Sequence, residues 1–243
     1  ELVGWRGALS FYGLASFIGV VAWLALGEAP QSAGESANRA IKPSDFIKII
    51  RSKTVLLLAN MDAVAFAQYS ALTTWLPLYY FEAHGIALIK TGLILGLIPL
   101  FAAIGIVAVG ILSFRFNRRK PFLYISGVMV GAGGFLSVFG VDTPWMYPGL
   151  LLLGAGSWIY VPVEMTIPME LPGVTANKVG IVTAAALTIG NGTTVLSPIF
   201  IGALTDFMNS YLPALSIVAI LPVTLLLATT FLPETGPKAA LRN

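Results

Sequence analysis

The sequence predicts an all-α, polytopic membrane protein with seven transmembrane helices. Of its 243 residues, 57% are hydrophobic and only 10% are charged, and the mean hydropathy is +0.86. Soluble proteins carry about 25% charged residues, whereas a helix that spans a membrane needs about 20 consecutive apolar residues. Several stretches reach that length without the alternating pattern of a β-strand. The spans are therefore predicted to be helical.

Seven runs are long and apolar enough to span a membrane, and the polar segments between them are short except for one. The predicted domain organisation is a transmembrane helix within residues 1–27, a long basic loop at 28–53, a six-helix unit at 54–235 and a polar tail at 236–243. Shorter loops are expected at residues 169–178 and 206–210. The runs cover residues 8–26, 54–81, 91–113, 121–140, 146–168, 179–203 and 212–232.

Basic residues predict the orientation of the spans. Residues 110–120 (GILSFRFNRRK) place four Lys and Arg side chains between two apolar runs. Such loops stay cytoplasmic under the positive-inside rule. With seven spans, the loops at 28–53, 115–120, 169–178 and 233–243 share that side, which leaves only Arg6 and Lys90 on the other. We expect a multi-pass protein of the cell (inner) membrane, with the amino end of this chain outside and the carboxyl end cytoplasmic.

Composition also excludes several classes of function. The chain has no cysteine and a single histidine, His84, so no metal site and no cofactor such as haem is expected. The net charge of +3 is explained by loops beside spans, and we expect no nucleic-acid partner. A retinal protein needs a lysine within a span, and a hydrolase needs a nucleophile with its base. Neither is present in the spans, so an enzyme is not expected. The chain begins at Glu1, and we expect it to be a piece of a longer protein.

Two ionisable residues lie inside predicted spans. Asp62 and Glu164 would each cost about 2.5–3.5 kcal/mol to insert, and such residues are functional candidates. A buried carboxyl group can also hold a proton, as proton coupling requires. The alternative for Asp62 is a hydrogen bond that packs two helices. For Glu164 the alternative is an ion pair with the basic segment at 110–120.

Helical spacing adds polar neighbours to each carboxyl group. At 100° per residue, Asp62, Tyr69, Thr73 and Tyr80 share one face of the second span. In the fifth span, Ser157, Tyr160 and Glu164 share a face that Trp158 flanks. The sixth span gathers small and polar residues on about a third of its circumference, which either line an aqueous path or bond helices together. These residues are Thr183, Gly190, Asn191, Thr194 and Ser197.

Polar residues are distributed unevenly among the spans. The first, fourth and seventh runs carry no charge, whereas the second, fifth and sixth carry the polar faces. We therefore expect the uncharged helices to face lipid and the polar ones to face a cavity. The binding candidates for a substrate or ion are Asp62, Tyr69, Thr73, Tyr160, Glu164, Asn191 and Thr194.

The order of short motifs resembles the carboxyl-terminal half of a major facilitator superfamily transporter, together with its sixth helix. Gly-Trp-Arg at 4–6 precedes a span, and a long basic loop then leads to six spans. The segment at 110–120 resembles the second copy of the family's loop motif, although Phe114 replaces its Asp and Asn117 its second Gly. The motif is matched by Gly110, Leu112, Arg115, Arg118 and Arg119, and further likeness lies in Glu170-Leu171-Pro172, Lys178, Gly180, Asn191, Pro198, Gly202, Asp206 and Pro233-Glu234-Thr235.

The resemblance implies a second six-helix bundle of a twelve-helix transporter that works by alternating access. Its partners would be a small-molecule substrate, a coupling ion, the lipid bilayer and an amino-terminal half that this chain lacks. Trp75-Leu76-Pro77-Leu78-Tyr79 and Pro99 look similar to symporters of organic anions driven by a proton or other cation. A cytoplasmic gate would be formed by Gly110, Arg115, Arg118, Arg119 and Glu170. The alternatives are a drug exporter of the same superfamily, or a seven-helix receptor or scaffold without transport activity.

Overall fold

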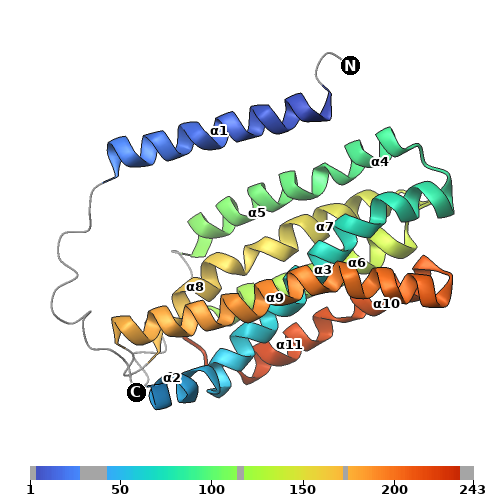
Figure 1. Cartoon of the computed structure of the whole chain (residues 1–243). Coiled ribbons are helices and arrows are strands. Elements are labelled where there is room, and N and C mark those ends of the chain that lie inside the picture. Colours follow the sequence, from blue (N-terminus) through green and yellow to red (C-terminus); the bar gives the residue numbers. More distant parts are fainter. Residues whose placement is uncertain (1–3, 28–42, 114–117, 172–174, 236–243) are drawn as a thin grey trace. The chain divides into compact units, whose positions relative to one another are not determined.

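The computed structural model describes residues 4–27, 43–113, 118–171 and 175–235 (Figure 1). The chain divides into two units, Glu1–Ala40 and Ile41–Asn243. The first holds helix α1 (Trp5–Leu26). Among the described residues, seven helical stretches are long and apolar enough to cross a membrane. The predicted all-α class with seven spans is confirmed.

The second unit is built from helices that are often interrupted within a span. The second span is the single helix α3, and the sixth is the single helix α9. The third, fifth and seventh spans are each made of two consecutive helices. In chain order the elements are α2 (Pro43–Ile50), α3 (Lys53–His84), α4 (Leu88–Leu95), α5 (Leu97–Ser113), α6 (Lys120–Phe139), α7 (Met146–Ile159), α8 (Val161–Glu170), α9 (Ala176–Met208), α10 (Tyr211–Ile220) and α11 (Pro222–Phe231).

The interruptions follow from proline and glycine. Pro99, Pro162 and Pro222 each lack the N–H that would continue the helical hydrogen bonding of the preceding turn. The spans accordingly break just before them, at Gly96, Tyr160 and Leu221. Within α9, Pro198 leaves the carbonyl of Thr194 without its helical donor, and the hydroxyl of Ser70 on α3 donates to that carbonyl instead at 2.9 Å. One helix thus supplies the bond that proline removes from the other.

Two segments that the sequence predicted as loops are partly helical. The basic loop at 28–53 contains α2, whose side facing α9 carries the apolar Ile49. The loop expected at 206–210 begins later, because α9 continues to Met208 and ends at Asn209 in the left-handed conformation, with φ of 51°. Asparagine tolerates this backbone region better than most residues, which favours a helix end there.

The six spans of the second unit run alongside one another (Figure 1). The most extensive pairings are α3 with α9, α6 with α7, and α5 with α7; α11 packs against both α3 and α6. Two buried apolar clusters fill this bundle. One lies around Leu58, Leu123 and Val163, and the other around Leu76, Leu150 and Leu215.

Hydroxyl groups join α3 to α9 at successive turns. Thr193 donates to the carbonyl of Ala63 at 3.0 Å, and Ser197 donates to that of Ala67 at 2.9 Å. The indole of Trp75 donates to the carbonyl of Pro198 at 2.9 Å. The polar side chains of the sixth span were predicted either to line an aqueous path or to bond helices together. Ser197 does the second.

Glycines bring α6 and α7 into direct backbone contact. A Cβ atom on Gly149 would lie 2.7 Å from Cβ of Leu136, and one on Gly156 would lie 2.8 Å from Cβ of Met129. Gly105 of α5 is similarly close to Ala155 and Ile159. By contrast, a Cβ on Gly92 or Gly110 would meet nothing within 4 Å among the described residues. Only part of the glycine-rich pattern thus serves close packing within this bundle.

Burial separates the spans of the bundle into two groups. In an apolar stretch of 18 residues within each of α3, α6, α7–α8 and α10–α11, about half of the residues are buried. In the corresponding stretches of α4–α5 and α9, only 28% and 17% of the residues are buried. The exposed apolar residues include Leu100, Ile104 and Val107 on α5 and Val195, Leu196 and Ile199 on α9. The uncharged fourth span is thus half-buried within this bundle, while the polar sixth is its most exposed member.

Candidate functional site

The two predicted carboxyl residues lie against each other in the bundle. Asp62 on α3 is 0% exposed and Glu164 on α8 is 2% exposed, and their carboxyl groups interact. We call Asp62 and Glu164 the carboxyl pair. The basic segment, considered as an alternative partner of Glu164, does not reach it among the residues described. The short helix α8 that carries Glu164 begins directly after Tyr160.

One hydroxyl group orients the carboxyl pair. Tyr160, fully buried at the junction of α7 and α8, donates its O–H to Oδ1 of Asp62 at 2.8 Å. In the described part of the chain, no N–H or hydroxyl group donates to Oδ2 of Asp62 or to either carboxyl oxygen of Glu164. Two ionised carboxylates have only acceptors, so a hydrogen bond between them requires one of them to carry a proton. Two carboxyl groups of this kind are chemically able to hold a proton or another small cation between them.

An aromatic group adjoins the carboxyl pair. The ring of Trp158 packs edge-on against Phe66 and Tyr69, with centroids 5.3 Å and 5.9 Å apart, and Phe66 also lies 6.2 Å from Tyr160. Tyr69, predicted as a binding residue, thus belongs to a half-buried aromatic wall next to Asp62 and Glu164.

Gly190 of α9 closes the other side of Asp62. A Cβ atom at Gly190 would lie 2.5 Å from Cβ of Asp62 and 3.2 Å from its Oδ2. Only glycine leaves room for the aspartate at this crossing of α3 and α9. The sequence placed Gly190 on a polar face but carried no sign of this contact, because the two residues are 128 positions apart.

Other predicted site residues do not join this group. Thr73 and Thr194 donate to carbonyls of their own helices, those of Tyr69 and Gly190. Asn191 is exposed on α9 and donates to the carbonyl of Leu187 at 2.8 Å. Tyr80 of the predicted α3 stripe is buried further along the helix, where it donates to the carbonyl of Ser137 at 2.6 Å. Residues that share a helix face by spacing therefore do not all reach the carboxyl pair.

Among the buried polar residues that sequence reasoning did not select, Gln68 has the largest side chain. Gln68, 0% exposed, donates through Nε2 to the carbonyl of Val130 at 3.2 Å, and its Oε1 has no donor in the described ranges. Gly134 of α6 leaves the space that this amide occupies. An amide side chain inside a span can itself indicate a functional residue. It was not selected because inserting a neutral side chain into a membrane costs less free energy than inserting a charged one.

Two of the predicted gate residues form a charged contact at the end of the bundle where α3 and α9 begin. Arg119 binds Glu170 through two nitrogens, with Nη2 at 2.6 Å and Nε at 3.1 Å from Oε1. Glu234, just after α11, accepts from the backbone N–H of Arg119 at 2.7 Å, which fastens the start of α6. Arg118 is exposed, Gly110 lies within α5, and Arg115 is outside the described residues.

Comparison with known proteins defines the family. The family model described as Major Facilitator Superfamily matches residues 1–198, more than half of the chain. The chain belongs to this superfamily. No solved structure gives a significant match.

Curated relatives of the chain are named as transporters. It is 27% identical over 203 residues to a probable galactarate/D-glucarate transporter of Escherichia coli, covering 76% of this chain and 44% of that protein. It is 29% identical over 134 residues to a probable nitrate/nitrite antiporter of Thermus thermophilus, covering 55% and 29%. It is 32% identical over 135 residues to vacuolar basic amino acid transporter 2 of Saccharomyces cerevisiae, covering 54% and 28%. The chain spans about half the length of these relatives, or less.

Proposed function

We propose that the chain is one half of a secondary transporter that moves a small organic anion by alternating access, driven by a proton or other cation gradient. The family and the transporter-named relatives support membrane transport rather than an enzyme activity. The observation that carries the mechanism is the carboxyl pair, in which Asp62 and Glu164 are buried together and only one of four carboxyl oxygens accepts from a described hydroxyl or N–H group.

The carboxyl pair suits the coupling cation better than the substrate. Two ionised carboxylates side by side in a span are unfavourable, because each loses its hydration and repels the other. A bound proton reduces both the cost of lost hydration and the repulsion between the carboxylates. The pair can therefore bind the proton when the site is open to one side of the membrane and release it when the site is open to the other. An organic anion would be repelled by the same charges. Its contacts on this half are proposed to come from the aromatic wall of Phe66, Tyr69 and Trp158.

The organic-anion class draws support from the extent of the alignments. The galactarate/D-glucarate transporter of Escherichia coli aligns with 76% of this chain, and a protein of the same name from Bacillus subtilis aligns with 87%. Both shares exceed those of the nitrate and amino-acid transporters. These matches concern half a transporter, so D-glucarate serves as the probe for the class. In this proposal the missing half supplies the cationic groups that hold the carboxylates.

A second six-helix bundle is proposed to cover α4–α5 and α9. These are the least buried spans of the unit, and their exposed residues are mostly apolar, as in Leu100, Ile104 and Leu196. Thr188 and Asn191 are exposed on α9 as well, so this face is mixed rather than purely lipid-like. A bundle packed there would also enclose the aromatic wall between the halves, where transporters of this architecture bind near the midplane.

Charge asymmetry supports the proposed orientation in the cell membrane. The end of the bundle that carries the Arg119–Glu170 contact also carries Lys48, Arg51, Lys53, Lys120 and Lys178. We assign this end to the cytoplasm and the His84 end to the outside. The domain limits at residues 27, 53 and 235 remain part of this proposal.

The proposal is tested by replacing Asp62 in the full-length protein. In proteoliposomes with an imposed inward proton gradient, Asp62→Asn should abolish accumulation of radiolabelled D-glucarate while the protein still reconstitutes. The control is Asp206→Asn, which removes an exposed carboxylate near the end of α9 and should leave accumulation unchanged. Unchanged accumulation in Asp62→Asn would remove Asp62 from the mechanism. Transport of nitrate or lysine in place of D-glucarate by the unmodified protein would contradict the organic-anion class.

A further inference from the structure

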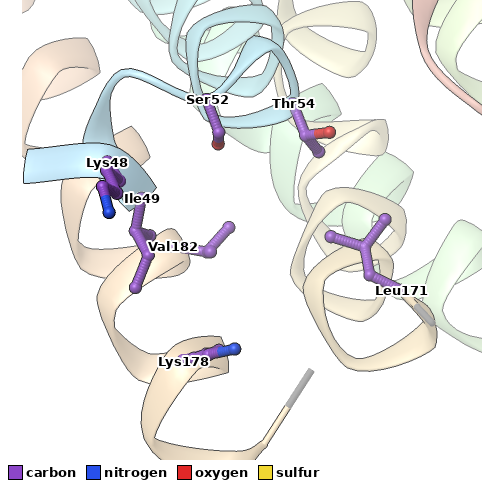
Figure 2. A pocket seen from close by; sticks show the side chains of 7 residues that line it. All are labelled: Lys48, Ile49, Ser52, Thr54, Leu171, Lys178 and Val182. Carbon is purple, nitrogen blue, oxygen red and sulfur yellow. The ribbon is translucent and has the colours of Figure 1, made fainter. Parts of the chain in front are cut away.

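A pocket lies apart from the carboxyl pair, where three spans begin or end. Figure 2 shows its lining by side chains from α2, the start of α3, the end of α8 and the start of α9. The pocket holds about 260 Å³, and its described lining residues are Lys48, Ile49, Ser52, Thr54, Leu171, Lys178 and Val182. Two are cationic, two carry hydroxyl groups, and none of the seven is acidic. This composition favours an anion.

The depth of the pocket in the membrane follows from the spans around it. The apolar stretches Lys53–His84 and Asn177–Met208 begin at the pocket, and Met146–Glu170 ends one residue before Leu171. The ends of apolar spans lie at the border between the hydrocarbon core and the lipid headgroups. A ligand in this pocket would therefore sit at the level of the headgroups, with the apolar side chains on the hydrocarbon side.

Helix α2 is built like a helix that lies in the membrane interface. Phe46 and Ile47 are 44% and 52% exposed, and the neighbouring Lys48 is exposed as well. An exposed apolar pair beside a cationic side chain is typical of interfacial helices, in which the apolar residues enter the acyl region and the cations meet the headgroups. This helix forms one wall of the pocket, and its packing against α9 brings Lys48 and Lys178 to the same opening (Figure 2).

The geometry points to a site for the phosphate group of an anionic phospholipid, held by Lys48 and Lys178. The apolar residues Ile49, Leu171 and Val182 would contact the glycerol and the first acyl carbons. Basic pockets between spans on the cytoplasmic side bind anionic headgroups in this way. This site is independent of the transport proposal.

The test measures lipid binding to the full-length protein in detergent by native mass spectrometry. Phosphatidylglycerol should bind saturably, and phosphatidylcholine should not. The double variant Lys48→Gln/Lys178→Gln should weaken phosphatidylglycerol binding at least about tenfold, because both cations are removed. The matched control for Lys178→Gln is Lys90→Gln, since each lysine is exposed and is the third residue of its helix. Lys90→Gln should change binding less than about twofold.

A competition experiment with inorganic phosphate distinguishes a lipid headgroup from a free phosphate ion as the ligand. At about 10 mM it should displace little phosphatidylglycerol, because it lacks the acyl contacts of the lipid. If phosphate binds with the same lysine dependence while the lipid does not, the ligand is a free anion and the lipid proposal is overturned. Equal loss in Lys90→Gln and Lys178→Gln, or no loss in the double variant, would overturn the site itself. Melting temperatures of all variants exclude loss of fold as the cause.

Discussion

Two glutamates of the same short helix have opposite surroundings. Glu164 and Glu170 both lie on α8, six residues or about 9 Å apart along the axis. The side chain of Glu170 is 23% exposed and accepts hydrogen bonds from two nitrogens of Arg119. Glu164 is 2% exposed, and neither of its carboxyl oxygens accepts a bond from an N–H or hydroxyl group in the described chain. The same residue type is satisfied at the membrane border and unsatisfied inside the span.

In the proposed mechanism, this difference separates a structural charge, Glu170, from a functional one, Glu164. Most buried polar groups in folded proteins are hydrogen-bonded, and each exception needs an explanation. The Arg119–Glu170 contact holds the ends of α6 and α8 together and is complete without any ligand. The carboxyl pair has one donor, Tyr160, for four carboxyl oxygens among the described residues, and we propose that it takes up the coupling proton or other cation.

The largest contrast is expected from the same substitution at the two glutamates. Glu164→Gln should reduce gradient-driven uptake of D-glucarate roughly 100-fold or more, the lower range for a group that transfers a proton. It should leave the thermal unfolding midpoint unchanged or raised, because a buried charge is removed. Glu170→Gln should instead lower stability by about 1–2 kcal/mol through a weakened bond to Arg119. Equal loss of stability in both variants would remove the distinction.

A methyl group at Gly190 should disturb the carboxyl pair without changing any ionisable residue. Gly190→Ala places a Cβ 2.5 Å from Cβ of Asp62, and this overpacking should cost about 1–3 kcal/mol. Gly180→Ala on the same helix is the control, since a Cβ there meets nothing within 4 Å among the described residues. Thermal unfolding and uptake are measured together. If both alanine variants behave alike, the contact between Gly190 and Asp62 does not constrain the site.

Removal of the hydroxyl group at Tyr160 should have a smaller effect. Tyr160→Phe keeps the ring but removes the single described hydroxyl that donates to Asp62, at 2.8 Å. One such bond contributes about 1–1.5 kcal/mol, so uptake should fall roughly tenfold rather than vanish. Tyr147→Phe, at a residue 48% exposed, should leave uptake unchanged. An unaltered rate in Tyr160→Phe would show that Asp62 needs no orientation by this residue.

The smallest effect is expected at the opposite end of the bundle. Nδ1 of His84 lies 2.7 Å from Oδ2 of Asp142, but the side chain of Asp142 is 72% exposed. Exposed ion pairs contribute about 0–1 kcal/mol, so His84→Asn should change the free energy of unfolding by less than about 0.5 kcal/mol. Unfolding by heat or denaturant measures this directly. A large loss would mean that this end, too, is held by a contact as strong as that of Arg119.

Much of the fold was predictable because membrane insertion leaves a strong local signal. Apolar length alone located seven spans, and Asp62 and Glu164 stood out as charges inside them. The breaks at Gly96 and Tyr160 were not predicted, although Pro99 and Pro162 are the local causes. The helix α2 was taken for loop, because eight residues between polar segments are too short for periodicity to be distinctive.

The sequence by itself determined the class, the number of spans and the two candidate carboxyl residues, since each depends on composition within a single stretch of about 20 residues. Only the tertiary structure decided that Glu164 lies against Asp62 while Glu170 binds Arg119, that Tyr160 donates to the pair, and that Gly190 makes room for it. These contacts join residues 50 to 130 positions apart. Helical period specifies the face on which a side chain lies but not which neighbouring helix meets it, or at what depth.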